Sequence, residues 1–204
     1  MTIVDSPVSI VILVLLALFY IISLASKDIV LQKFSLNPFS VVHSKQFYQI
    51  VTHIFIHLDF AHLLFNGLTF YFFAPHLEFI IGGDLLLLIF LTSGIVASLP
   101  SIIKQKDNPS YYSLGASGAI SGVIFSYILF FPTSRIYIFF IPIGIPAPIF
   151  AMLYLAYCYY AGKNPETKIN HDAHFWGAVW GLVLTAILFP NIVKYFFSML
   201  GLAF

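Results

Sequence analysis

Charged residues are scarce in this chain. Only 8% of its 204 residues are Asp, Glu, Lys or Arg, and the formal net charge is +1. A soluble domain carries about a quarter charged residues to hydrate its surface, so the shortage excludes an ordinary soluble protein and a disordered one. Nucleic acid is also unfavoured as a partner, because its binding requires several Lys and Arg side chains against phosphates.

Cysteine is scarcer still, since Cys158 is the single one and lies in an apolar stretch. One cysteine makes neither a disulfide framework nor a cysteine-rich metal cluster. The sequence also lacks an internal repeat and paired acidic residues within its apolar stretches. These absences weaken the interpretation of the protein as a transporter, because many transporter folds are built from inverted repeats.

The sequence is instead rich in long apolar runs. Hydrophobic residues make up 60% of the sequence, and the mean hydropathy is +0.97. Because a membrane-spanning helix needs about 20 mostly apolar residues, we predict an all-α membrane protein, a compact bundle of six transmembrane helices in a single domain over residues 1–204. The predicted spans are residues 7–25, 60–81, 85–103, 115–131, 149–161 and 173–189, with a long structured loop over 26–59.

Polar residues inside such spans are costly and therefore indicate function. Ser117 begins the fourth span, but a serine in a membrane helix often bonds its own backbone, so Ser117 alone favours a packing role. His174 at the head of the sixth span changes this interpretation. Both spans carry small-residue faces that let two helices approach closely, namely Gly118 with Gly122 and Gly177 with Gly181.

A serine and a histidine brought together by those faces form a nucleophile and its base. The hydroxyl of Ser117 is a weak nucleophile until a base removes its proton. Burial favours the neutral form of His174, which is the form that accepts a proton. Asp172 is not assigned as a third member, because two residues along a helix it points to a different face.

Attack on a carbonyl develops an oxyanion, which needs hydrogen-bond donors already in place. His62 and Asn66 are four residues apart on one face of the second span, and both side chains carry suitable N–H groups. We predict that they are the oxyanion donors, together with the backbone N–H of Ser117.

With these residues in view, the sequence closely resembles the rhomboid family of intramembrane serine proteases. The resemblance rests on Thr52-His53-Ile54-Phe55-Ile56-His57, Ala61-His62-Leu63-Leu64-Phe65-Asn66-Gly67, Gly115-Ala116-Ser117-Gly118, and Ala173-His174-Phe175-Trp176-Gly177 with Gly181. It implies that Ser117 is the nucleophile, His174 the general base, and His62 and Asn66 the oxyanion donors. It marks His57, Gly115, Gly118, Gly177 and Gly181 as further motif positions.

The resemblance also implies an activity and a location. We expect an endopeptidase that cleaves peptide bonds in or near the transmembrane segments of single-pass membrane proteins. We expect it to reside as a multi-pass protein in a bacterial inner membrane and to need no metal or organic cofactor. The resemblance also implies that the fifth helix and the loop after it gate substrate entry.

The sequence departs from the family pattern in three places, one of which is Ala74, where the family usually has a glycine. Tyr48-Gln49 stands where the family commonly has a Trp-Arg pair in its first loop. Ser121 stands where the family has an aromatic ring that stacks on the catalytic histidine. Trp176 or another ring has to take over that contact, or the base is less firmly held.

Two other functions remain open. His53 with His57, and His171 with His174, have spacings that metal or haem ligands can adopt, but the sequence has no His-Glu-x-x-His signature. A catalytically weak relative that binds transmembrane helices without cleaving them is the second alternative. The presence of both Ser117 and His174 favours the enzyme.

Overall fold

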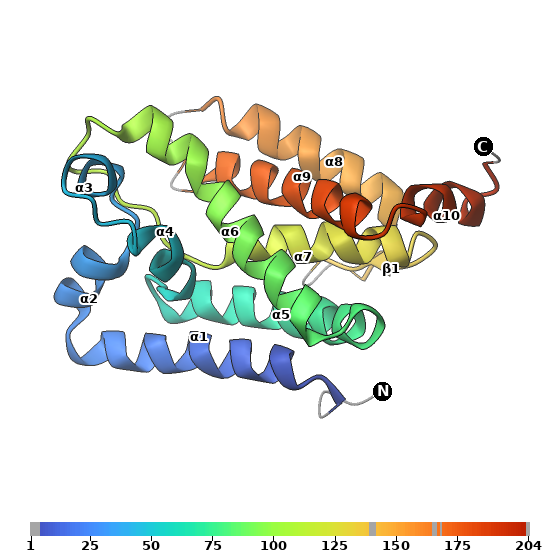
Figure 1. The fold of residues 1–204 in the computed structure, drawn as a ribbon, viewed down its shortest axis with the longest axis horizontal. Helices are drawn as coiled ribbons and strands as arrows, with labels where there is room; N and C mark the ends of the chain where they lie inside the picture. The colour runs from blue at the N-terminus through green and yellow to red at the C-terminus, as the bar shows by residue number, and fades with distance from the viewer. Residues whose placement is uncertain (1–4, 139–141, 165–166, 168, 203–204) are drawn as a thin grey trace.

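The computed structural model describes residues 5–138, 142–164, 167 and 169–202, and these are predominantly helical (Figure 1). Four short helical segments, α2, α3, α4 and η2, lie between α1 and α5, and α6 is followed by the shorter helices α7, α8, α9 and α10. The elements are α1 Pro7–Ala25, α2 Lys27–Phe34, α3 Pro38–His43, α4 Gln49–Thr52, the 3₁₀ turn η2 His53–Phe55, α5 Phe60–Ile81, α6 Gly83–Gln105, α7 Ser117–Phe130, β1 Arg135–Ile136, β2 Ile145–Pro146, α8 Ala147–Ala161, α9 His171–Leu188 and α10 Ile192–Met199.

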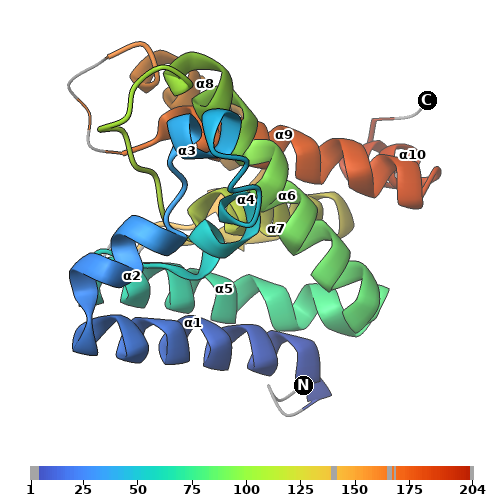
Figure 2. The ribbon, with the colours of Figure 1, turned by 60° about the vertical axis from the view of Figure 1, so that its left-hand side comes forward.

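Helix α7 is the centre of the bundle. It packs against α5, α6 and α9, and Figures 1 and 2 both show it enclosed by them. Eleven of its fourteen residues are buried, so it has hardly any surface for lipid. Ser117 and Phe130 at its two ends are half-buried, and the buried residues between them hold the helix in place.

Helix α1 lies along α5 (Figure 2) and is attached to it by a buried carboxylate. Glu78 in α5 accepts hydrogen bonds from the backbone N–H groups of Val8 and Ser9 and from the Ser9 hydroxyl, at 2.6 to 2.8 Å. The first N–H groups of a helix have no partner within the helix, and its N-terminus carries a partial positive charge. Glu78 satisfies both requirements within the apolar bundle.

The predicted loop over residues 26–59 contains short helices and is fixed by Gln49. The Gln49 side chain is buried, accepts a hydrogen bond from the N–H of Asn37 at 3.0 Å, and donates one to the carbonyl of Lys33 at 3.1 Å. His53, one turn further on, lies 2.9 Å from the Gln49 carbonyl through Nδ1. Burial lowers the pKa of His53 to about 4, so its neutral ring donates this bond. Gln49 thus anchors the loop at the position where the family has its Trp-Arg pair.

Among the described residues, three helices are long and apolar enough to cross a membrane: α1, α5 and α6. A fourth candidate is α9 together with α10, which is bent by 108° at the break between them, and α7 and α8 are shorter apolar helices. Helices α1 and α5 have the same bounds as two of the predicted spans. Helices α6, α7, α8 and α9 differ from the approximate bounds of their predicted spans by one to two residues at one or both ends.

The backbone of Gly115 explains why α7 begins later than its predicted span. The fourth span was predicted to begin there, but Gly115 has a φ of +114°, which only glycine adopts readily. Helix α7 therefore begins at Ser117. The sixth span begins earlier than predicted, at His171, because the Asn170 side chain caps it by accepting a hydrogen bond from the N–H of Ala173.

A short antiparallel hairpin precedes α8. Residues Ile145–Pro146 form β2, which pairs with β1, Arg135 opposite Pro146. Helix α8 then begins at Ala147, two residues before the predicted span, and Pro148 at its second position needs no N–H partner.

Candidate active site

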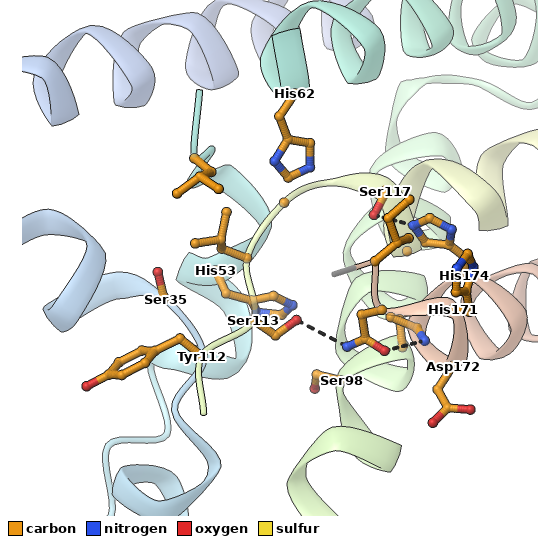
Figure 3. A pocket seen from close by; sticks show the side chains of 18 of the residues that line it. Ser35, His53, His62, Ser98, Tyr112, Ser113, Ser117, His171, Asp172 and His174 are labelled. Atoms are coloured by element: carbon orange, nitrogen blue, oxygen red, sulfur yellow. Dashed lines mark hydrogen bonds between the residues drawn. The ribbon is translucent and has the colours of Figure 1, made fainter. Parts of the chain in front are cut away.

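Ser117 and His174 point toward one another across the contact between α7 and α9 (Figure 3). The Ser117 Oγ lies 2.7 Å from the Nε2 of His174, which is a short distance for a hydroxyl donating to an unprotonated ring nitrogen. Each residue stands in the first turn of its helix. The structure therefore holds the two predicted residues in direct hydrogen-bond contact.

Glycines set this distance by letting the two backbones touch. A Cβ built at Gly177 would collide with the carbonyl oxygen of Gly118, and one built at Gly181 would collide with that of Gly122. Any larger residue would push α9 away from α7, because packed interiors have no spare volume. The two predicted glycine faces are thus in contact, one turn after another along both helices.

Asn170 fixes the start of α9, a role that no sequence motif indicated. Besides capping the helix, its side-chain nitrogen donates to the hydroxyls of Ser101 and Ser113, at 2.8 and 3.1 Å. Ser101 belongs to α6 and Ser113 to the segment before α7. Asn170 thus connects three parts of the chain one turn before His174. Its position on a short loop with many other polar residues gave no signal in the sequence.

His62 and Asn66 both lie close to the segment that leads into Ser117. A Cβ built at Gly115 would lie 2.6 Å from the Nε2 of His62 and 3.8 Å from the Nδ2 of Asn66. The absence of that Cβ lets the two side chains approach the backbone just before Ser117. Asn66 is only 7% exposed, and its Nδ2 has no hydrogen-bond partner among the described residues. A buried donor without a partner is costly, and this one is available to a bound group.

His57 contacts the ring of His62 edge to face, at 4.9 Å between ring centroids. It belongs to the loop before α5. Burial lowers the pKa of His57 to about 4, and repulsion from His62 adds to this effect. His57 is therefore neutral at physiological pH, and it packs against His62 without adding a charge near Ser117.

Tyr154 from α8 stacks on His174, and Trp176 does not take this position. The Tyr154 and His174 rings lie 6.5 Å apart at an angle of 17°, whereas Trp176 is 45% exposed. The Tyr154 hydroxyl lies 2.7 Å from that of Ser121. A bulky side chain at position 121 would occupy the space of this hydroxyl, so the small Ser121 and the large Tyr154 are complementary. One tyrosine among four on α8 gave no sequence signal.

Asp172 lies away from the Ser117–His174 pair. Its carboxylate accepts a hydrogen bond from the ammonium group of Lys104 at 2.6 Å. Lys104 stands at the end of α6, so this ion pair joins α9 to α6 near the surface.

Two cavities meet at Ser117. The first, of about 830 Å³, has polar walls that include His53, His62, Asp172 and His174, and we call it the polar cavity (Figure 3). The second, of about 960 Å³, is lined mainly by apolar and aromatic side chains of α5, α7 and α8, and we call it the apolar cavity. Of the described residues, Asn66 and Ser117 line both cavities.

These features define a class of protein: a multi-pass helical membrane protein with a hydrogen-bonded serine and histidine between a polar and an apolar cavity. Comparison with known proteins agrees with this description. The family model described as Rhomboid domain matches residues 44–191, which is well over half of the chain. The chain belongs to the rhomboid family.

Individual relatives are similar at low identity. The putative rhomboid protease YdcA of Bacillus subtilis is 32% identical over 124 residues, 60% of this chain and 61% of the relative. Rhomboid protease GluP of the same organism is 28% identical over 149 residues, 73% of this chain and 27% of the relative. The mitochondrial RHOMBOID-like protein 12 of Arabidopsis thaliana is 25% identical over 183 residues, 80% of this chain and 53% of the relative. The chain thus spans less than two thirds of each relative's length.

Proposed function

We propose that this protein is an intramembrane serine endopeptidase that cleaves single-pass membrane proteins in or near their transmembrane segments. One observation carries the proposal: the Ser117 hydroxyl is hydrogen-bonded to His174 where the polar and apolar cavities meet. A protease inside a membrane needs water and an apolar substrate at the same atom. A polar cavity on one side of Ser117 and an apolar cavity on the other meet both needs.

The reaction begins with proton transfer from Ser117 to His174. The Ser117 Oγ attacks the substrate carbonyl carbon as the His174 Nε2 takes its proton, and a C–O bond forms. His174 then gives that proton to the leaving amine as the C–N bond breaks, which leaves an acyl group on Ser117. A water molecule from the polar cavity then attacks the acyl carbon as His174 takes its proton. His174 returns this proton to the Ser117 Oγ as the acyl C–O bond breaks and the new carboxyl terminus leaves.

Asn66 and His62 stabilise the tetrahedral intermediates in this mechanism. Support comes from the Asn66 side-chain nitrogen, which lacks a partner in its buried position, and from the closeness of both side chains to Gly115. A donor that has no hydrogen-bond partner before the reaction can bind the oxyanion more strongly than it binds the substrate carbonyl. Only an interaction that is stronger in the transition state than in the ground state accelerates the reaction. The backbone N–H of Ser117, in the first turn of α7, is the third donor.

The apolar cavity is the proposed substrate site. Its lining includes Phe72 and Phe73 of α5, Ile124 of α7 and Phe150 of α8, so it accepts apolar side chains at low desolvation cost. A transmembrane helix hides its carbonyls in its own hydrogen bonds, so the substrate has to unwind next to Ser117. Helix-breaking and small residues near the cut site are therefore favoured.

We further propose that α1, α5, α6, α7, α8 and α9 are six spans of a single domain over residues 1–204 in a bacterial inner membrane. The 14 residues of α7 extend about 21 Å, less than the roughly 30 Å of a bilayer core. Because α7 is enclosed by its neighbours, it has no need to reach both membrane surfaces itself. Its short length leaves room for the polar cavity above Ser117, below the membrane surface.

Cleavage of a labelled single-pass membrane protein in detergent tests the proposed function. The full chain should release a fragment, and Ser117→Ala and His174→Ala should each lower kcat/KM by about 10⁴-fold or more. Ser98→Ala is the matched control, since Ser98 also lines the polar cavity and donates its hydroxyl proton to the carbonyl of Ile95. It should cleave at the wild-type rate.

Two results would contradict the proposal. Cleavage that survives either Ser117→Ala or His174→Ala removes the dyad. A wild-type chain that retains labelled transmembrane helices but releases no fragment supports helix binding without proteolysis.

A further inference from the structure

Three side chains of types that can bind a metal ion lie close together, and one of them is His174, the base of the proposed dyad. Cys158 of α8 and His171 and His174 of α9 each place one ligand atom, a sulfur or a ring nitrogen, so that all three lie within 4.8 Å of one another. Cys158 and His171 are buried, at 1% and 4% exposure. Thiolate and imidazole are the ligands that zinc prefers in proteins.

His171 packs against aromatic rings and leaves one of its ring nitrogens unsatisfied by the described residues. Its Nδ1 is buried and has no hydrogen-bond partner among the described residues. Its ring lies nearly perpendicular to the rings of Tyr157 and His174, at 5.2 and 6.0 Å between centroids. A buried ring nitrogen without a partner is costly, and a metal ion would satisfy it.

We propose that Cys158, His171 and His174 form a zinc site that inhibits the enzyme. Ligand atoms in a tetrahedral zinc site lie about 3.5 Å apart, so small side-chain movements of about 1 Å close the cluster around the ion. Three protein ligands leave the fourth position to water. Both His171 and His174 line the polar cavity, which gives the ion a route from the aqueous side.

Zinc blocks the base whichever ring nitrogen of His174 it binds. If the ion binds Nε2, the Ser117 hydroxyl loses its acceptor directly. If the ion binds Nδ1, the neutral ring carries its proton on Nε2, which then cannot accept the proton of Ser117. Zinc bound at this site therefore prevents His174 from acting as the base for Ser117.

The inhibition rests on the proposed function, whereas the binding of the ion does not. Binding is therefore measured first, with Co²⁺ as a probe in place of zinc. A thiolate bound to Co²⁺ gives an intense near-ultraviolet charge-transfer band. Because Cys158 is the single cysteine of the chain, such a band can come from no other residue. The full chain in detergent should show a saturable band that equimolar Zn²⁺ removes.

Variants assign the ligands. Cys158→Ser should abolish the band, and His171→Ala should weaken Co²⁺ binding by about tenfold or more, as expected for loss of a ligand. His43→Ala is the matched control, since His43 is exposed and faces Asp107, and it should leave the band unchanged. Absence of the band in the wild-type chain overturns the proposal, as does equal Co²⁺ affinity in His171→Ala and the wild type.

Proteolysis is the second readout. Zn²⁺ should inhibit cleavage by the wild-type chain, and Cys158→Ser, with normal activity in the absence of metal, should require about tenfold more Zn²⁺. Equal inhibition of both overturns the inhibitory site, because Ser117 and His174 alone would then explain it. If the wild-type chain cleaves nothing, the proposed function fails, and the cobalt band still decides whether the metal site exists.

Discussion

The polar and apolar cavities differ in their walls and in the elements that form them. The polar cavity is lined by α5, α6, the starts of α7 and α9, the segments that precede these two helices and the loop over residues 26–59, and its walls include four of the seven histidines. The apolar cavity lies against α5, α7 and α8, and its described lining contains no histidine. Ser117 and Asn66 belong to both.

The difference indicates that the two cavities have different roles on either side of the Ser117 hydroxyl. In the proposed mechanism, the groups that move protons stand beside the polar cavity, and the substrate binds in the apolar cavity. Tyr154 is the exception, because it lines the apolar cavity and also stacks on His174. Contacts on the apolar side therefore also influence the alignment of the base.

After Ser117 and His174, the largest effect should come from Asn66, which also lines both cavities. Asn66→Ala should lower kcat by about 10² to 10³-fold, the usual cost of one oxyanion donor. KM should stay nearly the same, since the bond forms only in the transition state. Cleavage kinetics with a labelled membrane substrate measure both constants. An unchanged kcat would remove Asn66 from the proposed mechanism.

Tyr154 should give a smaller effect. Tyr154→Ala removes the ring that stacks on His174 and should lower kcat by about 10 to 100-fold through misplacement of the base. Tyr154→Phe keeps the ring and loses only the hydrogen bond to Ser121, so it should retain most of the activity. Steady-state kinetics of the two variants separate the roles of ring and hydroxyl. Equal activity of both would show that the stack does not position His174.

The smallest effect should arise from filling the apolar cavity. Thr69 lines it, and among the described residues its hydroxyl donates to the backbone carbonyl of Phe65, so Thr69→Trp fills part of the proposed substrate site. KM for a membrane substrate should rise several-fold with kcat unchanged, because contacts in this cavity bind the substrate equally well in the ground state and in the transition state. Leu88→Trp, exposed on α6, is the matched control with normal KM. A normal KM in Thr69→Trp would place the substrate elsewhere.

Much of the fold and of the candidate site could be predicted from local patterns. The scarcity of charge predicted a membrane protein, and apolar runs located α1 and α5 to the residue. Ser117 and His174 stood out because polar groups in apolar spans are rare. The glycines four residues apart predicted that their helices approach closely, and these helices do meet at Gly118 and Gly177.

Contacts between distant parts of the chain could not be predicted in this way. Tyr154 reaches His174 from a separate helix, and Cys158 joins His171 only through the packing of α8 on α9. Spacing within one element cannot indicate such partners. Gln49 illustrates the same limit, because its anchoring role depends on backbone groups up to sixteen residues away.

The central claim is that Ser117 is a nucleophile activated by His174. Its most direct measurement is covalent labelling of the full chain with a fluorophosphonate, whose phosphorus is attacked by an activated serine, followed by mass spectrometry of the peptides. The adduct should appear on Ser117 and should be lost in His174→Ala, while Ser98→Ala keeps it. An adduct on another serine, or labelling of Ser117 that persists without His174, would contradict the account.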